Sequence, residues 1–188
     1  MTRALLLIDI QHGFDDPYWG QRNNPQAEAN AARLLSRWRE TGGPVFHVRH
    51  LSRNPLSPLQ AGTSGAAFNP LVAPRPGEPA LEKSVNSAFI GTGLQQLLQE
   101  RAVRDLVICG LTTPHCVSTS ARMAANLGYG VVLAHDACAA FTICADTSWQ
   151  PSAPAPSAEQ IHTAAINHLH GEFVSAQSTE TILGHAHG

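Results

Sequence analysis

The sequence predicts an α/β protein, a single domain built on a doubly wound parallel sheet with helices on both faces. Apolar runs of strand length alternate along the chain with segments whose apolar residues recur at helical spacing. The chain also has 188 residues and 43% hydrophobic content, which is enough for one well-cored domain and short for two. We expect this domain to span residues 1–184 and residues 185–188 to form a frayed tail.

The first half of the predicted sheet consists of two strands separated by a helix. Residues 4–10 are almost continuously apolar, as expected for a strand that is buried on both faces. A helix opens at Asn24-Pro25, and its apolar residues keep helical spacing until Gly42-Gly43 ends it. Residues 44–50 follow as the second strand, which completes a βαβ unit.

The second half repeats this alternation. Thr92 can cap a short helix before a strand at residues 105–110, and a helix starting at Thr113 precedes a strand at residues 130–136. Ser157 with Gln160 resembles a capping box, and the helix that it opens runs to Gly171 before a last strand at residues 173–176. The order of these elements favours the doubly wound arrangement.

Two irregular stretches interrupt the alternation. Residues 51–82 contain six prolines and are far longer than the usual connection of about 4 to 6 residues. This segment is expected to be a lid, a pocket wall, a subunit contact or an ordered surface excursion. Residues 150–157 are rich in proline and serine and are expected to cross the surface as a linker.

Composition excludes several partners. A formal net charge of -2 and a pI near 6.5 give no electrostatic reason to expect nucleic acid or an anionic membrane. The apolar run at the N-terminus meets Asp9 and has no small-residue cleavage site, so it predicts a strand rather than a signal peptide. Four cysteines without regular spacing indicate reduced thiols, and we expect a cytoplasmic protein.

Cys116 is the candidate nucleophile. Thr113-Pro114 resembles an N-cap followed by proline at the first helical position, which places Cys116 at about the third helical residue. The unpaired N–H groups and the dipole of a helix start favour a thiolate there. The alternative is a buried packing residue, which is how we interpret Cys109 and Cys138; Cys144 has no clear place.

Asp9 and Lys83 are candidate partners of this thiol. Asp9 ends the first strand, and Cys116 follows the strand expected beside it across the reversal of strand order, so the two can meet. A carboxylate near a thiol can act as its general base, and a lysine near both would stabilise their anionic forms. The alternatives are a cap or turn residue for Asp9 and a solvated surface residue for Lys83.

The chain resembles the isochorismatase-like cysteine hydrolases, which include nicotinamidases and N-carbamoylsarcosine amidohydrolase. Three segments carry the resemblance: Leu-Leu-Ile-Asp9-Ile-Gln11-His-Gly-Phe14, Glu82-Lys83-Ser-Val-Asn86-Ser-Ala-Phe89, and Val107-Ile-Cys-Gly110-Leu-Thr112-Thr-Pro-His-Cys116-Val117. It implies a triad of Asp9, Lys83 and Cys116 on a six-stranded sheet. It also implies a non-proline cis peptide before Thr112, which turns the N–H groups of Thr112 and Cys116 into the site, and a homodimer or homotetramer.

The resemblance implies hydrolysis of a C–N bond in a small amide, carbamoyl or ureido compound through a thioester on Cys116. Branches that cleave the vinyl ether of isochorismate carry another residue at this position, which argues against that reaction. Metal-binding nicotinamidases carry an Asp-x-His pair after the second strand. Here His47 and His50 have no acid close by in the sequence and point to opposite faces of a strand, so we expect strand packing and neither a metal nor another cofactor.

The remaining pocket residues are hypotheses. Candidates for the lining are Gln11, Phe14, Trp19, Asn86, Phe89, His115 and Phe141, with core packing as the alternative for each aromatic residue. Asp15-Asp16 is expected near the pocket mouth, where it would disfavour an anionic substrate. Two other functions stay open: a small-molecule-binding or interaction protein that retains the fold, and a nucleotide-binding domain, although the glycine-rich turn that nucleotide binding needs is missing after the first strand.

Overall fold

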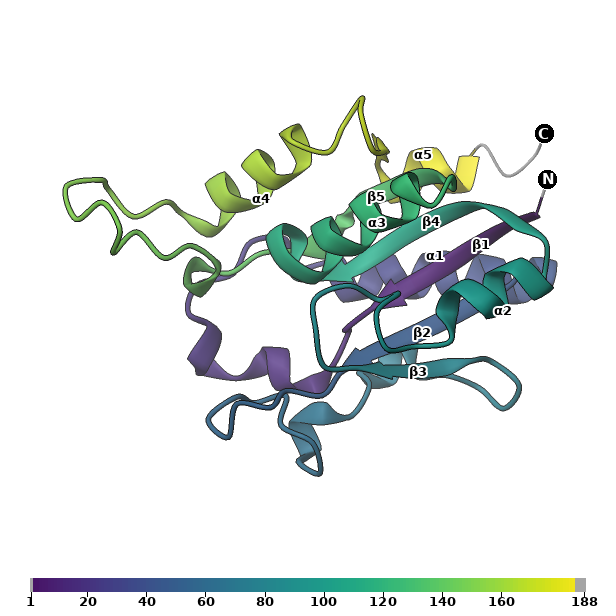
Figure 1. Ribbon diagram of the computed structural model, residues 1–188, viewed down its shortest axis with the longest axis horizontal. Coiled ribbons are helices and arrows are strands. Elements are labelled where there is room, and N and C mark those ends of the chain that lie inside the picture. The colour runs from purple at the N-terminus through teal and green to yellow at the C-terminus, as the bar shows by residue number, and fades with distance from the viewer. Residues whose placement is uncertain (1, 185–188) are drawn as a thin grey trace.

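Six parallel strands form one sheet in the order β3-β2-β1-β4-β5-β6, which confirms the predicted fold class (Figure 1). The structure is a computed structural model that describes residues 2–184. The strands are β1 (Thr2–Ile8), β2 (Val45–His50), β3 (Ala80–Lys83), β4 (Val103–Leu111), β5 (Gly130–Ala139) and β6 (Ser175–Gln177).

Helices cover both faces of this sheet. They are α1 (Ala27–Thr41), α2 (Leu94–Glu100), α3 (Ser118–Asn126), α4 (Ala158–Asn167) and α5 (Thr179–Gly184). In Figure 1, α2 and α3 lie in front of the sheet and α1 lies behind it, where α5 packs against α1. Strand order reverses beside β1, because the chain first moves outward from β1 to β2 and β3 and then returns to β4 on the other side of β1.

Local sequence explains where several of these helices begin and end. α1 stops at Gly42, which adopts a left-handed conformation with φ 69° that glycine accepts without a steric penalty. α4 begins at the predicted capping box, in which Ser157 accepts a hydrogen bond from the N–H of Gln160 and the Gln160 side chain accepts one from the N–H of Ser157.

The two central strands make the core and bring the site together. In β1, residues 4 to 8 are each at most 2% exposed, as expected for a strand that is covered on both faces. At Gly110 in β4, an added Cβ would lie 1.9 Å from the Ile8 carbonyl oxygen, and φ is 134°. Only glycine permits this approach, so the ends of β1 and β4 lie tightly side by side.

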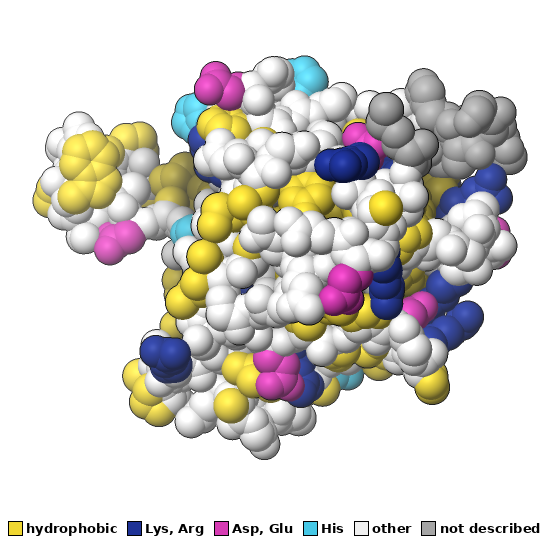
Figure 2. Space-filling model, turned by 45° about the vertical axis from the view of Figure 1, so that its right-hand side comes forward, with side chains coloured by type: hydrophobic (Ala, Val, Ile, Leu, Met, Phe, Trp, Pro, Cys, Tyr) yellow, Lys and Arg dark blue, Asp and Glu magenta, His cyan; other side chains and the backbone are white. Residues whose placement is uncertain are grey.

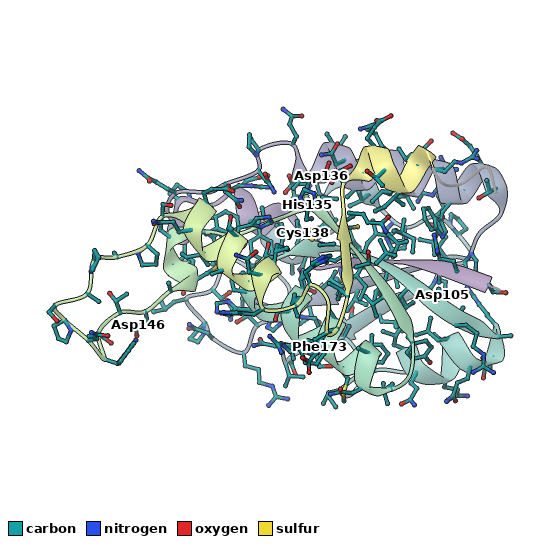
Figure 3. The ribbon with its side chains drawn as sticks, turned by 90° about the horizontal axis from the view of Figure 1, so that it is seen from above. Asp105, His135, Asp136, Cys138, Asp146 and Phe173 are labelled. Carbon is teal, nitrogen blue, oxygen red and sulfur yellow. The ribbon has the colours of Figure 1, made fainter. Side chains whose placement is uncertain are left out.

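Some predicted elements need correction. β3 starts inside the stretch 51–82, which was expected to be a connection. This strand was not predicted, because four residues at the edge of a sheet give too weak an apolar pattern. α5 was also missed; Asp136 of β5 holds its start by accepting hydrogen bonds from the N–H and the hydroxyl of Thr179, at 2.7 and 2.8 Å (Figure 3). The expectation for residues 185–188 lies outside the described residues.

The prediction for the helix after β4 was wrong in its first turn. Residues Thr113–Val117 form a π-helical turn that precedes α3. Thr112 takes the N-cap position, and the Thr113 hydroxyl instead bonds His162 Nδ1 at 2.8 Å. A buried side-chain partner has therefore replaced the cap that the sequence favoured.

The surface carries charges of both signs. Figure 2 shows Lys and Arg side chains interspersed with Asp and Glu on one face, with hydrophobic side chains between them. The segment between β5 and α4, which includes Asp146, extends away from the body of the molecule (Figures 1 and 3). Among the described residues, none of the helices combines the length and the apolar character that crossing a membrane requires.

Candidate active site

Asp9 occupies the point where β1 ends and the chain turns into the site. Its φ is 54°, a left-handed conformation that is uncommon outside glycine and that aspartate tolerates better than most residues. The N–H of Asp9 bonds the carbonyl of Val48 at 2.8 Å, so the neighbouring strand β2 holds this turn in place. The side chain is fully buried, and its Oδ1 atom has no hydrogen-bond partner in the described chain.

Lys83, the last residue of β3, connects the groups of the site. Its Nζ atom lies 2.5 Å from Asp9 Oδ2, 3.0 Å from His50 Nδ1 and 3.2 Å from Cys116 Sγ. An ammonium has three N–H donors, and each has an acceptor here. Lys83 is only 3% exposed, so the alternative interpretation as a solvated surface residue is wrong.

Cys116 lies in the π-helical turn after β4, and its thiol faces Asp9 and Lys83. The peptide bond between Leu111 and Thr112, just before this turn, is cis. The thiol also lies 3.8 Å from Asn86 Oδ1. The structure therefore brings together the three residues Asp9, Lys83 and Cys116, which come from three separate segments of the sequence.

Burial controls the proton affinity of this cluster. It raises the pKa of Asp9, against the opposing effect of the Lys83 charge. Burial, followed by the charge of Asp9, also raises the pKa of the Cys116 thiol, which is the opposite of the direction expected from the helix start. Two acids beside one buried cation favour a single negative charge, so they hold one proton between them.

His50 is a site residue that the sequence analysis interpreted only as strand packing. Burial and the charge of Lys83 lower its pKa to about 4, so the ring is neutral at pH 7 and accepts a hydrogen bond from Lys83. Its position next to Lys83 follows from the pairing of His50 with Lys83 across β2 and β3. Because β3 was not predicted, the sequence offered no signal for this pairing.

The side chains around the Lys83 ammonium are spaced as they would be around a metal ion. Oxygen, nitrogen and sulfur atoms of Asp9, His50 and Cys116 lie within 4.8 Å of one another, a spacing that could hold a metal ion. The ammonium of Lys83 hydrogen-bonds all three side chains, and it therefore supplies the positive charge at this point. His47 is directed elsewhere and pairs with Glu78 at 3.1 Å.

A comparison with known proteins decides the family. A sequence profile of the isochorismatase domain matches residues 3–181. The chain belongs to the isochorismatase family. The Bacillus subtilis isochorismatase family protein YrdC is 40% identical over 183 residues, which are 96% of this chain and 94% of that protein.

Other relatives agree with this assignment. The maleamate amidohydrolase of Pseudomonas putida is 30% identical over 150 residues, covering 71% of this chain and 70% of its own length. A crystal structure of an isochorismatase family protein from Chromobacterium violaceum superposes with a TM-score of 0.90 and 44% identity, covering 97% of this chain and 92% of that one. The chain is thus a member of a hydrolase family that includes amidohydrolases.

The site of this isochorismatase family protein opens into a pocket of about 180 Å³. This is smaller than the ~300–1,000 Å³ of sites for drug-sized ligands. Its lining comprises Asp9, Phe14, Trp19, His50, Ser52, Ser57, Leu59, Asn86, Thr112, His115 and Cys116. Four of the pocket residues named from the sequence therefore face it, namely Phe14, Trp19, Asn86 and His115.

Three residues named for the pocket lie outside its lining. Gln11 instead holds the backbone of His50. Its side chain accepts a hydrogen bond from the N–H of His50 at 2.8 Å and donates one to the carbonyl of His50 at 3.0 Å. Phe141 packs against Phe14 with a centroid distance of 5.7 Å, and Phe89 packs in the core beside Tyr129. For these two aromatic residues the packing alternative is correct.

Part of the long segment 51–82 forms a wall of the pocket. Ser52, Ser57 and Leu59 belong to this segment, so one of its expected roles is confirmed. The sequence could not identify the individual residues, because an irregular loop has no periodicity that tells which side chains point inward. Opposite them, Trp19 packs on Phe14 at a centroid distance of 4.6 Å and donates a hydrogen bond to the Gly13 carbonyl.

Proposed function

We propose that the protein hydrolyses the C–N bond of a small amide, carbamoyl or ureido compound, with Asp9, Lys83 and Cys116 as its catalytic triad. One observation carries this proposal: a buried ammonium joins a carboxylate and a thiol at the base of a pocket, with distances of 2.5 and 3.2 Å. Such a group of perturbed titratable side chains in a cleft is typical of an active site.

In the first half of the reaction, Asp9 takes the proton of the Cys116 thiol as Sγ attacks the carbonyl carbon. The Oδ1 atom of Asp9 has no partner in the described chain and is free to receive this proton. Lys83 keeps its contacts with both groups, so the negative charge moves from oxygen to sulfur and on to the substrate beside a fixed cation. This arrangement allows a thiol with a raised pKa to react.

The developing oxyanion is stabilised by the backbone N–H groups of Thr112 and Cys116. The Thr112 N–H donates none of the hydrogen bonds found within residues 2–184, and both residues line the pocket. Loss of one such donor typically costs about 3 kcal/mol of barrier height. Asp9 then gives its proton to the departing nitrogen, the C–N bond breaks, and a thioester on Cys116 remains.

Water completes the cycle. Asp9 takes a proton from a water molecule, whose oxygen attacks the thioester carbon. The C–S bond breaks, the carboxylic or carbamic acid leaves, and the proton returns to sulfur. His50 stays neutral throughout and holds the third N–H of Lys83.

The experiment is an ammonia-release assay over a panel of small amides, carbamoyl compounds and ureido acids. The wild type is expected to turn over part of the panel, and Cys116→Ala is expected to abolish that activity while the circular dichroism spectrum stays unchanged. Cys144→Ala serves as the control, because this half-buried thiol lies outside the triad. Turnover by Cys116→Ala at the wild-type rate would refute the mechanism. A wild type without turnover whose Cys116 reacts like an ordinary thiol would instead support a ligand-binding role.

A further inference from the structure

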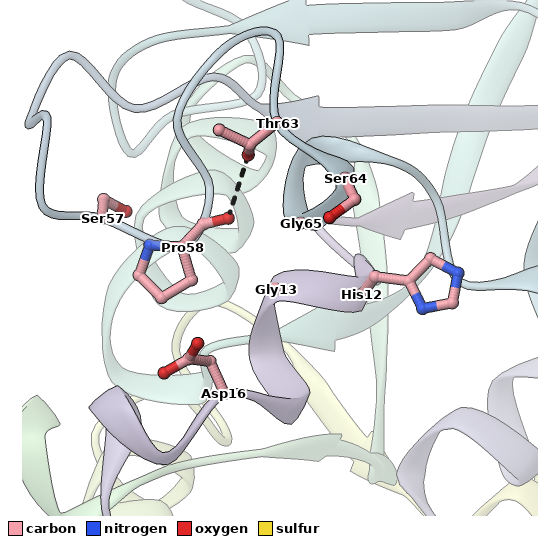
Figure 4. A pocket seen from close by; sticks show the side chains of 8 residues that line it. All are labelled: His12, Gly13, Asp16, Ser57, Pro58, Thr63, Ser64 and Gly65. Carbon is pink, nitrogen blue, oxygen red and sulfur yellow. Dashed lines mark hydrogen bonds between the residues drawn. The ribbon is translucent and has the colours of Figure 1, made fainter.

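A second hollow adjoins the proposed active site. It has a volume of about 500 Å³ and is lined by His12, Gly13, Asp16, Ser57, Pro58, Thr63, Ser64 and Gly65 (Figure 4). Ser57 lines both this outer hollow and the pocket of Cys116. The two also use neighbouring residues of the same segments, since Phe14 and Leu59 face the inner pocket while Gly13 and Pro58 face the outer hollow.

Close backbone contacts fix the shape of the outer hollow. A Cβ on Gly13 would lie 2.7 Å from the Pro58 carbonyl oxygen, and one on Gly65 would lie 2.0 Å from the same atom. Only residues without a side chain let the segment after β1 approach the segment around Pro58 so closely. Gln11 adds a hydrogen bond from its side chain to the Ala66 carbonyl at 3.0 Å. The hollow is therefore a formed feature, and it shares Ser57 with the pocket of Cys116.

The lining of the outer hollow carries a negative charge and no positive one from Lys or Arg. Asp16 supplies a carboxylate, and Figure 4 shows it pointing toward Ser57 and Pro58, while the ring of His12 points away. One oxygen of Asp16 accepts the N–H of Tyr18 at 2.8 Å, and the other forms no hydrogen bond or ion pair within the described part of the chain. Neither Lys nor Arg lines this hollow, and Ser57, Thr63 and Ser64 add hydroxyl groups.

We propose that the outer hollow is a subsite for the part of the substrate that lies remote from the cleaved bond, and that it binds a cationic group such as an alkylammonium. This inference rests on the proposed function of Cys116 and extends it to a substrate class. A cation there meets the free oxygen of Asp16 and the hydroxyl groups, whereas an anion meets a like charge. The inner pocket of about 180 Å³ has room for a molecule about the size of a benzene ring, so a longer substrate would extend into the outer hollow.

The test uses affinity labelling and needs no knowledge of the natural substrate. Cys116 is alkylated with N-(6-aminohexyl)iodoacetamide or with the neutral N-hexyliodoacetamide, and second-order rates are measured by intact mass. Peptide mapping and the Cys116→Ala variant establish that Cys116 is the residue labelled. The preference of the wild type is the ratio of the cationic rate to the neutral rate.

Asp16→Asn removes the charge but keeps the helix cap, because asparagine accepts the Tyr18 N–H equally well. It should reduce the preference roughly two- to fivefold, the range of an exposed ion pair, and 1 M salt should remove the difference. Asp15→Asn is the matched control, since its exposed carboxylate has the same charge and does not line the hollow. Equal preferences in the wild type and both variants would overturn the subsite.

The outcomes for subsite and function can be told apart. Alkylation needs only an accessible thiol, while ammonia release needs the whole catalytic cycle. A preference that depends on Asp16 without any turnover would keep the subsite and reject the hydrolase. If turnover depends on Cys116 but the ratio of the cationic to the neutral rate is the same with and without the Asp16 charge, the hydrolase is kept and the subsite is rejected.

Discussion

Replacing Asp9 by asparagine should make the Cys116 thiol more acidic and the protein less active at the same time. The Asp9 charge is the second-largest cause that raises the pKa of Cys116, after burial, while Lys83 acts in the opposite direction. Asparagine keeps the shape and one acceptor for Lys83 but removes the negative charge. The thiolate, 3.2 Å from Lys83, then becomes the partner of the buried cation.

The replacement of Asp9 should lower both the activity and the stability of the protein. Loss of a positioned general base typically lowers turnover by about 10²- to 10⁴-fold. Breaking a buried ion pair destabilises a protein by about 3–5 kcal/mol when the remaining charge stays unpaired. In Asp9→Asn this loss should be largest where the thiol is protonated and should shrink as the pH rises and the thiolate forms beside Lys83.

Two assays on the same samples measure the acidity of the Cys116 thiol and the activity of the protein. The pH profile of Cys116 alkylation by iodoacetamide should have a lower midpoint in Asp9→Asn than in the wild type, and ammonia release should be nearly lost. Asp146→Asn is the control, because this fully exposed residue lies on the projecting segment (Figure 3). An unchanged midpoint, or turnover within threefold of wild type, would refute the account of the charges in the site.

Two further predictions concern His50, which contacts Lys83 of the triad, and Glu78, which pairs with Arg39 and His47. Replacing His50 by leucine leaves a buried Lys83 donor unpaired and should cost about 1–3 kcal/mol of stability, while His50→Asn keeps an acceptor and should retain most of it. Because the folded pKa of His50 is about 4 and its ordinary value is 6.5, wild-type stability falls as the pH drops through this window, and His50→Asn should lack that loss in urea denaturation. Glu78→Gln should weaken the contacts with Arg39 and His47; since Arg39 lowers the pKa of Glu78 to about 2, the stability difference from wild type is full above about pH 4.5 and fades toward pH 2. A pH-independent difference would contradict this assignment.

Sequence reasoning was strongest where a pattern has one physical cause. The apolar runs located the central strands because a strand buried on both faces has no polar positions. Asp9 could be singled out because a carboxylate inside such a run needs a partner. The reversal of strand order then predicted that Asp9 and Cys116 meet, and they do.

Sequence reasoning failed where three-dimensional context outweighs local preference. The π-helical turn at Thr113–Val117 follows from contacts such as the bond between Thr113 and His162, which lie 49 residues apart. The direction of the Cys116 pKa was wrong because burial and the Asp9 charge exceed the effect of a helix start. His50 could not be found, since its role depends on β3, a strand of four residues.

The central claim is that Cys116 carries the acyl group of the substrate. The most direct test is to mix the wild type with a compound that it hydrolyses, quench the reaction in acid within milliseconds and measure the intact mass. The account predicts a transient mass increase equal to the acyl group, located on Cys116 by peptide mapping and released by hydroxylamine. Turnover without any such adduct, or an adduct on another residue, would contradict it.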